Sequence, residues 1–234
     1  MDGARQISIQ TLVTTVELRD AGELLDAMNL QGHPVIIGNL CGENRVYREG
    51  EALIVCHDLR GVGQNRNAIL SRAVADICVL ADDDMRFCTG YEQTVARVFL
   101  ENPNADVVIF NFLEKSEGRR TVRKSTRVGL HNYMKYGAAR FAFRRRTLAY
   151  RGILFSTMFG GGACHQCGED SLFLRACLRA GLHVVAVPEA LAALTDARES
   201  TWFRGYTDRY LFDKGVFLGI AHPRLAGAMA LLLC

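Results

Sequence analysis

Short apolar runs alternate with helix-like segments through the first half of the chain. The runs have the length and composition of buried strands, and they predict strands over residues 7–16, 34–38, 52–56, 77–81 and 106–113. Between them, the sequence predicts helices over residues 21–28, 64–75 and 89–100. Thr89 and Glu92 have the spacing of a capping box at the start of the third helix. Strands separated by helices form βαβ units, so we expect an α/β fold with a Rossmann-like, mostly parallel central sheet and helices on both faces.

The second half of the chain is less regular. It has candidate strands over residues 119–128 and 140–146, a helix over residues 171–180 that Gly181 ends, and a strand over residues 183–187. A chain of 234 residues can bury a full core, and this one shows no internal repeat, low-complexity segment or linker. We therefore expect one domain that spans residues 1–234.

Basic residues gather in one part of the chain. Residues 115–151, here called the basic segment, hold 12 of the 28 Lys and Arg residues and one acidic residue, Glu117. Such a segment suits nucleic acid, anionic lipid or a phosphate-bearing substrate, and it is equally compatible with a solvated face that keeps the protein soluble. Known RNA- and DNA-binding motifs are absent, so we expect no nucleic-acid partner.

Cysteine usage and hydropathy indicate a cytoplasmic protein. No signal peptide opens the chain, and no apolar run reaches the roughly 18 residues that a membrane span needs. The eight cysteines form no disulfide framework, and we expect them to be reduced. Cys164 and Cys167 have metal-like or redox-like spacing, but no second pair follows to complete a zinc site, and we expect neither role. The apolar stretch 225–234 can pack on the core, lie on a membrane surface or continue into a longer tail.

Three consecutive aspartates, Asp82, Asp83 and Asp84, follow the apolar run at residues 77–81. Open α/β sheets bind ligands where such strands end. Clustered carboxylates repel one another unless a cation lies among them, and Mg²⁺ takes carboxylate oxygens together with substrate phosphates. The cluster therefore indicates a metal-dependent site for a phosphorylated ligand. The alternative is a solvated acidic turn.

A second pair of carboxylates, Glu169 and Asp170, stands at a predicted helix start. Helix capping alone explains carboxylates at this place, because they complement the helix dipole. The glycines at 160–162 add a second signal, since a glycine loop lets backbone approach a ligand closely. A carboxylate beside a bound sugar can deprotonate an acceptor hydroxyl as a general base.

The segment 61–67 places an arginine near another helix start. It is neither a Walker loop nor a dinucleotide fingerprint, because it lacks their spacing. Arg66 can contact a phosphate or a carboxylate from there, or form a surface ion pair.

Taken in order, these motifs resemble family 2 glycosyltransferases of the inverting A-type fold, and in particular a bacterial subgroup. The resemblance covers about residues 9–215. It rests on Gly63–Met85, on Gly90–Glu92 with Ala105–Asn111, on Phe159–Gly162 through Gly168–Leu174, and on Glu199–Phe203.

The resemblance implies a hexosyltransferase-like enzyme that needs Mn²⁺ or Mg²⁺. It would move a sugar from a nucleotide diphosphate sugar, usually UDP-linked, to a hydroxyl of a glycan or lipid-linked acceptor in bacterial surface polysaccharide synthesis. Residues 1–115 would bind the nucleotide sugar, and residues 116–234 would bind the acceptor and end in C-terminal helices. The basic segment would then recognise a lipid-pyrophosphate acceptor or hold the enzyme at the inner face of the membrane.

The resemblance also assigns roles to residues. Asp170 matches the catalytic base, with Glu169 orienting beside it. Asp82 or Asp83 would contact ribose or sugar, and Asp83 or Asp84 would hold the metal, with Asp82 and Asp84 preferred as the Asp-x-Asp pair. The acceptor would meet Gly161, Gly162 and Trp202, and Arg66 would belong to the nucleotide-sugar site.

One departure affects the nucleotide base. Asn39 stands where the family places a base-reading Asp, so base recognition would rest on Asn39 and on Thr14, Thr15 or Glu17. This leaves uridine specificity open. The competing functions are a catalytically inactive sugar- or nucleotide-binding scaffold of the same fold and a sugar nucleotidyltransferase. The latter needs a glycine-rich loop with a basic residue after the first strand, where this chain has residues 14–17 instead.

Overall fold

The computed structural model describes residues 7–113, 121–195 and 207–227. Within these residues, ten strands form one sheet in the order β3-β4-β2-β1-β5-β9-β7-β10-β6, and β8 also pairs with β10. The strands are β1 (Ile9–Val16), β2 (Val35–Leu40), β3 (Arg45–Glu49), β4 (Ala52–His57), β5 (Ile77–Asp82), β6 (Met85–Phe87), β7 (Val107–Phe112), β8 (Thr126–Val128), β9 (Phe141–Arg144) and β10 (Val184–Leu194). The helices are α1 (Ala21–Ala27), α2 (Val62–Leu70), α3 (Tyr91–Glu101), α4 (Arg145–Arg151), α5 (Glu169–Arg179) and α6 (Asp208–Ala221).

The central strands run in one direction. Parallel pairing joins β4 to β2, β2 to β1, β1 to β5, and β7 to β10. Strand β9 pairs antiparallel with both β5 and β7, so those two strands also share a direction. The expected mostly parallel central sheet is confirmed, with antiparallel strands at β3, β6, β8 and β9.

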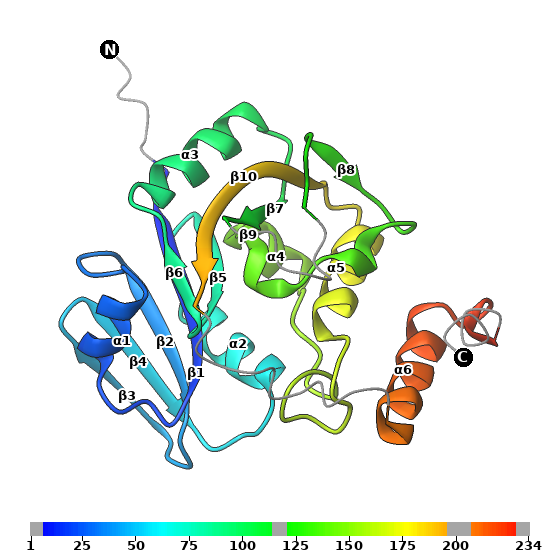
Figure 1. The fold of residues 1–234 in the computed structure, drawn as a ribbon, viewed down its shortest axis with the longest axis horizontal. Coiled ribbons are helices and arrows are strands. Elements are labelled where there is room, and N and C mark those ends of the chain that lie inside the picture. The colour runs from blue at the N-terminus through cyan, green and yellow to red at the C-terminus, as the bar shows by residue number, and fades with distance from the viewer. Residues whose placement is uncertain (1–6, 114–120, 196–206, 228–234) are drawn as a thin grey trace.

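Two apolar cores lie on the two faces of this sheet, because successive strand residues point to opposite faces. On β1, Val13 belongs to one core and Leu12 to the other. Helices α1 and α3 contribute to the first core, and α2, α4 and α5 contribute to the second. Helices therefore cover both faces, as expected, while α6 lies away from the sheet at the edge of the molecule (Figure 1).

The predicted element bounds were wrong in several places. The helix expected over residues 64–75 is α2, which ends at Leu70, and Val74 is 76% exposed rather than on an apolar helix face. The expected capping box is absent from α3, where Gly90 is the N-cap with φ 77° and makes no side-chain cap bond. The strand expected over residues 119–128 is limited, in the described part, to β8.

Among the strands and α-helices, β3, β6 and α4 had no sequence prediction. Helix α6 was expected only as a C-terminal helix without bounds. Strand β3 has no alternating apolar pattern, because it lies at the edge of the sheet with four of its five residues exposed. In the described ranges, no helix has the length and apolar character to cross a bilayer.

Candidate active site

The carboxyl ends of β1 and β5 meet at one edge of the sheet. The register pairs Thr14 with Asp82, which brings two threonines beside two aspartates. Thr14 Oγ1 donates to Asp82 Oδ1 over 2.9 Å, and Thr15 Oγ1 donates to Asp83 Oδ2 over 2.6 Å. These four residues, each predicted as part of the nucleotide-sugar site, therefore form one cluster at the strand ends, where open α/β sheets bind ligands.

The three consecutive aspartates point into different surroundings. Asp82 lines one cavity, of about 390 Å³, and Asp83 lines another, of about 530 Å³. The backbone carbonyl of Asp84 accepts hydrogen bonds from the N–H and the hydroxyl of Thr195, which fastens the turn after β5 to the end of β10. The choice of the metal-binding aspartate therefore stays a prediction.

The 530 Å³ cavity is formed by the end of β1, the following loop and the start of α1. Its charged residues are mostly acidic: Glu17, Asp20, Glu23 and Asp83 against Arg19. Asn39 does not line it. That side chain is buried, where its Oδ1 accepts from the N–H of Leu18 over 2.9 Å. Asn39 thus braces the loop that walls this cavity, and Thr15 and Glu17 are the predicted base-site residues that reach the cavity itself.

Arg66 lies at the centre of the second cluster. It comes from α2, and 5% of its side chain is exposed. Its two terminal nitrogens form ion pairs of 3.1 Å with Asp82 Oδ1 and with Glu169 Oε1. The sequence left a phosphate contact, a carboxylate contact and a surface ion pair as alternatives for Arg66. The structure shows carboxylate contacts, and the arginine side chain that makes them is buried rather than on the surface.

Asp170 stands in the first turn of α5, directly after Glu169. Its Oδ1 accepts the backbone N–H of Ser171 over 2.7 Å. Burial and then the negative charge of Glu169 raise the pKa of Asp170 to about 7, against the opposing effects of the Ser171 N–H, Arg66 and Lys214. A carboxylate that titrates near neutral pH is suited to general-base catalysis, because it can take and release a proton under working conditions.

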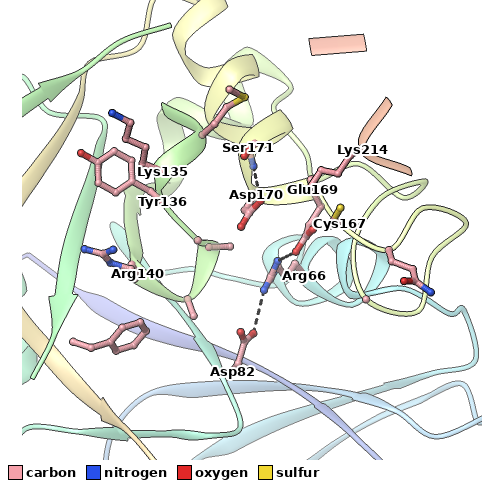
Figure 2. Close-up of a pocket in the computed structure, with 18 residues that line it drawn as sticks. Arg66, Asp82, Lys135, Tyr136, Arg140, Cys167, Glu169, Asp170, Ser171 and Lys214 are labelled. Carbon is pink, nitrogen blue, oxygen red and sulfur yellow. Dashed lines mark hydrogen bonds and ion pairs between the residues drawn. The ribbon is translucent and has the colours of Figure 1, made fainter. Parts of the chain in front are cut away.

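The 390 Å³ cavity joins this carboxylate to the sheet edge. Asp82, Arg66, Glu169 and Asp170 all line it, and Figure 2 shows Arg66 between the Asp82 and Glu169 carboxylates. The opposite wall is the segment with Lys135, Tyr136 and Arg140. A cavity between a sheet edge and a helix start has room for a reacting group that contacts both.

The glycine loop supports the helix that carries Asp170. Gly160 has φ 104°, and a Cβ there would lie 2.7 Å from the Glu169 carboxyl carbon. The Gly161 carbonyl accepts the N–H of Val62, which joins the loop to α2. Of the predicted acceptor residues, Gly161 lines the cavity, Gly162 is exposed and does not, and Trp202 lies outside the described residues.

Helix α6 adds a lysine that the sequence did not predict for the site. Lys214 lines the 390 Å³ cavity. Beside it, the fully buried Asp213 accepts from His165 Nδ1 over 2.8 Å and from the N–H of Gln166 over 3.0 Å. Burial alone would raise the pKa of Asp213, but these two hydrogen bonds and Arg209 lower it overall. The buried carboxylate thus holds α6 against the loop that precedes α5.

Several arginines of the basic segment bind backbone carbonyls. Arg144 donates to the carbonyls of Phe99, Pro103 and Ala105, and Arg145 donates to those of Val74 and Ala75. Arg140 is buried and donates to the carbonyl of Phe110 over 2.6 Å. The segment is therefore partly a structural element. Its exposed cations in the described part are Arg123, Lys124, Arg127, Lys135, Arg146 and Arg151.

The aspartates at the sheet edge have the chemistry to share a hard cation with a ligand. Among the described residues, no three His, Cys, Asp or Glu side chains gather to hold a metal ion by themselves. Mg²⁺ is usually held by one or two carboxylates together with substrate phosphates rather than by a protein cage. A carboxylate such as Asp83, fixed by the Thr15 hydroxyl and facing a cavity, fits that requirement.

Comparison with solved structures identifies the fold. The structure of TarS residues 1–349 from S. aureus in complex with UDP-GlcNAc matches with a TM-score of 0.65 and 15% identity, over 92% of this chain and 66% of that one. This protein has a glycosyltransferase fold. The UDP complex of the same TarS fragment gives a TM-score of 0.62 at 16% identity, over 92% of this chain and 65% of that one.

The match extends over only part of the longer protein. Against the TarS structure that is not limited to residues 1–349, the TM-score is 0.64 at 14% identity, over 96% of this chain and 41% of that one. The sequence matches no protein-family model and no curated protein. At these identities the likeness concerns the fold alone.

Proposed function

We propose that this chain is a metal-dependent, inverting family 2 glycosyltransferase that moves a sugar from a UDP-linked donor to a hydroxyl of a glycan or lipid-linked acceptor. The carrying observation is that one cavity joins Asp82, at the edge of the sheet, to Asp170, a half-buried carboxyl whose pKa is raised to about 7. The glycosyltransferase fold supports this reading, since TarS was solved with UDP and with UDP-GlcNAc.

In this proposal Asp170 is the general base. It takes the proton of the acceptor hydroxyl as the hydroxyl oxygen forms a bond to the anomeric carbon. The bond from that carbon to the diphosphate breaks on the opposite side, and the nucleoside diphosphate leaves with the electron pair. Attack opposite to the leaving group inverts the anomeric configuration.

The donor would lie along the ends of β1 and β5. The nucleoside would occupy the 530 Å³ cavity beside Thr15 and Glu17, and Asp82 would contact the sugar or ribose. Asp83 and Asp84 would hold Mn²⁺ or Mg²⁺. The ion, when bound, neutralises charge that builds on the leaving diphosphate.

The acceptor would enter the 390 Å³ cavity from the side of Lys135, Tyr136 and Lys214. Membrane contact through the basic segment belongs to the proposal as well. A test of that contact should change exposed cations such as Arg123, Lys124 and Arg127, because Arg144 and Arg145 hold backbone carbonyls. If the triple Ala variant binds vesicles of anionic lipid as the parent chain does, or if neither binds, the contact is ruled out.

The decisive experiment is a thermal-shift screen of nucleoside diphosphates and their sugars, with and without Mn²⁺. A ligand at about 100 times its dissociation constant stabilises a folded protein by roughly 2.7 kcal/mol. We expect stabilisation by UDP that requires the metal and is lost in Asp83→Asn. The exposed Asp26→Asn, on α1, serves as the matched control. Absence of any nucleotide shift would reject the transferase, and binding without sugar transfer or donor hydrolysis would indicate the scaffold.

A further inference from the structure

Arg66 connects three elements that the sequence keeps far apart. Its guanidinium, from α2, lies 3.1 Å from Asp82 at the end of β5 and 3.1 Å from Glu169 at the start of α5. The exposed fraction is 5% for the Arg66 side chain and 13% for that of Glu169. Asp82 is more exposed, at 39%. A buried charge is costly unless it is paired, so Arg66 and Glu169 depend on each other, while solvent screens the pair with Asp82.

The packing around Arg66 fixes its position. Its guanidinium carbon lies 5.4 Å from the centroid of the Phe155 ring. One turn earlier on α2, a Cβ on Gly63 would lie 2.0 Å from the Ser156 carbonyl oxygen. The backbone of α2 therefore packs directly against the backbone of the segment that carries Phe155 and Ser156. Asn67 exchanges two hydrogen bonds with the backbone of Phe155. The arginine is therefore held by its surroundings and not only by its carboxylates.

The charges around Asp170 affect its ionisation. Glu169, adjacent on α5, opposes its ionisation, while Arg66 on α2 and Lys214 on α6 favour it. The other ionisable groups that line the cavity are Asp82, Lys135, Tyr136, Arg140 and Cys167. Among the described residues, Arg66 is the cation that forms an ion pair with Glu169, over 3.1 Å.

We propose that Arg66 is a positioning residue for Asp170: it cancels the charge of Glu169 and fixes Glu169 and Asp82 in one arrangement, so that the adjacent Asp170 can lose its proton. This role rests on the proposed function, in which Asp170 is the base. It differs from a nucleotide-phosphate contact for Arg66, because the arginine acts through Glu169 rather than on the donor.

The proposal predicts a reversal in a double-mutant cycle. Arg66→Gln leaves Glu169 without its cation, so the titration midpoint of Asp170 should rise by about one pH unit. Glu169→Gln removes the opposing charge, so the midpoint should fall below its parent value. In the variant with both changes, the midpoint should return towards the parent value. A merely structural loss at Arg66 would not be reversed by a second substitution at Glu169.

The measurement is an NMR titration of the ¹³C-labelled aspartate carboxyls, with the Asp170 signal assigned by its loss in Asp170→Asn. Arg97→Gln is the matched control, because Arg97 on α3 also bridges two glutamates, Glu101 and Glu189, but is half exposed. It should leave the Asp170 midpoint unchanged.

Two further arms keep the test decisive. Arg66→Lys retains the charge and should keep the midpoint within a few tenths of a unit, even if Arg66→Gln does not fold. An unmoved midpoint in Arg66→Gln, or a Glu169→Gln variant whose midpoint does not fall, overturns the proposal. Because the NMR signal needs no turnover, this result is independent of the nucleotide screen, which tests the proposed function itself.

Discussion

The carboxylates on the two sides of the site are held in different ways. At the sheet edge, Asp82 and Asp83 accept hydrogen bonds from the hydroxyls of Thr14 and Thr15. At the start of α5, Asp170 accepts one backbone N–H and is half-buried beside Glu169, and its pKa is raised to about 7. Aspartates can therefore have different roles on the two sides of the site, one held in place by hydroxyls and the other suited to accept a proton, because the environment of each side chain sets its role.

The largest expected effect comes from removing the proton acceptor. Asp170→Asn keeps the shape of the side chain but cannot take a proton, so kcat for sugar transfer should fall by about 10²–10⁴-fold. Affinity for the nucleotide, measured by calorimetry, should stay within about twofold, because residue 170 does not line the cavity proposed for the nucleoside. Asp26→Asn should retain full activity. A comparable loss of nucleotide affinity would show that the two sides are not distinct.

A smaller effect is expected at the sheet edge. Thr15→Val removes the hydroxyl that fixes Asp83 and keeps the shape of the side chain. Loss of a group that orients a metal ligand typically costs 10–100-fold in metal affinity or activity. We expect the apparent affinity for Mn²⁺ and UDP to fall by about tenfold, with the pH profile of transfer unchanged. Thr94→Val, which removes a hydroxyl that bonds the Gly90 carbonyl on α3, is the control.

The sequence predicted the sheet better than the connections between its parts. The buried strands follow apolar runs, because a strand covered on both faces must be apolar throughout. The edge strand β3 has no such run, and α6 is fixed by tertiary contacts: its Asp213 is held by His165, 48 residues away in the chain. Contacts over that distance leave no local pattern to read.

The site shows the same division. Asp82, Arg66, Glu169 and Asp170 were candidates from their local motifs, and the fold brings them to one cavity. Lys214 was missed because it lies on α6. The amide of Asn39 was expected at the base, whereas it bonds the loop backbone at Leu18. Motifs indicate residue chemistry, while the direction of a side chain depends on packing.

Stability should depend on pH through Asp170. Its pKa is near 3.8 in the unfolded chain and about 7 in the folded one. Between these two values the folded state binds a proton that the unfolded state has lost. The contribution of Asp170 to the free energy of unfolding is therefore fully present below pH 3.8 and is lost as the pH rises through about 7. Asp170→Asn removes that dependence, so its gain in Tm over the parent should be larger at pH 8 than at pH 5, by roughly 5–10 °C. Differential scanning calorimetry at both values measures it; an equal gain would mean that Asp170 titrates normally.

The smallest effect tests the far wall of the acceptor side. Lys214 favours the ionised form of Asp170 from α6, but its side chain is only partly buried, so solvent screens the interaction. Lys214→Met keeps the length of the side chain and removes its charge. We expect the acidic limb of the kcat/KM profile to move to higher pH by a few tenths of a unit, and Lys124→Met, exposed in the basic segment, to leave it in place. Because kcat/KM reports the pKa of the free enzyme, an unmoved limb or a shift to lower pH would show that Lys214 does not favour the ionised form of Asp170.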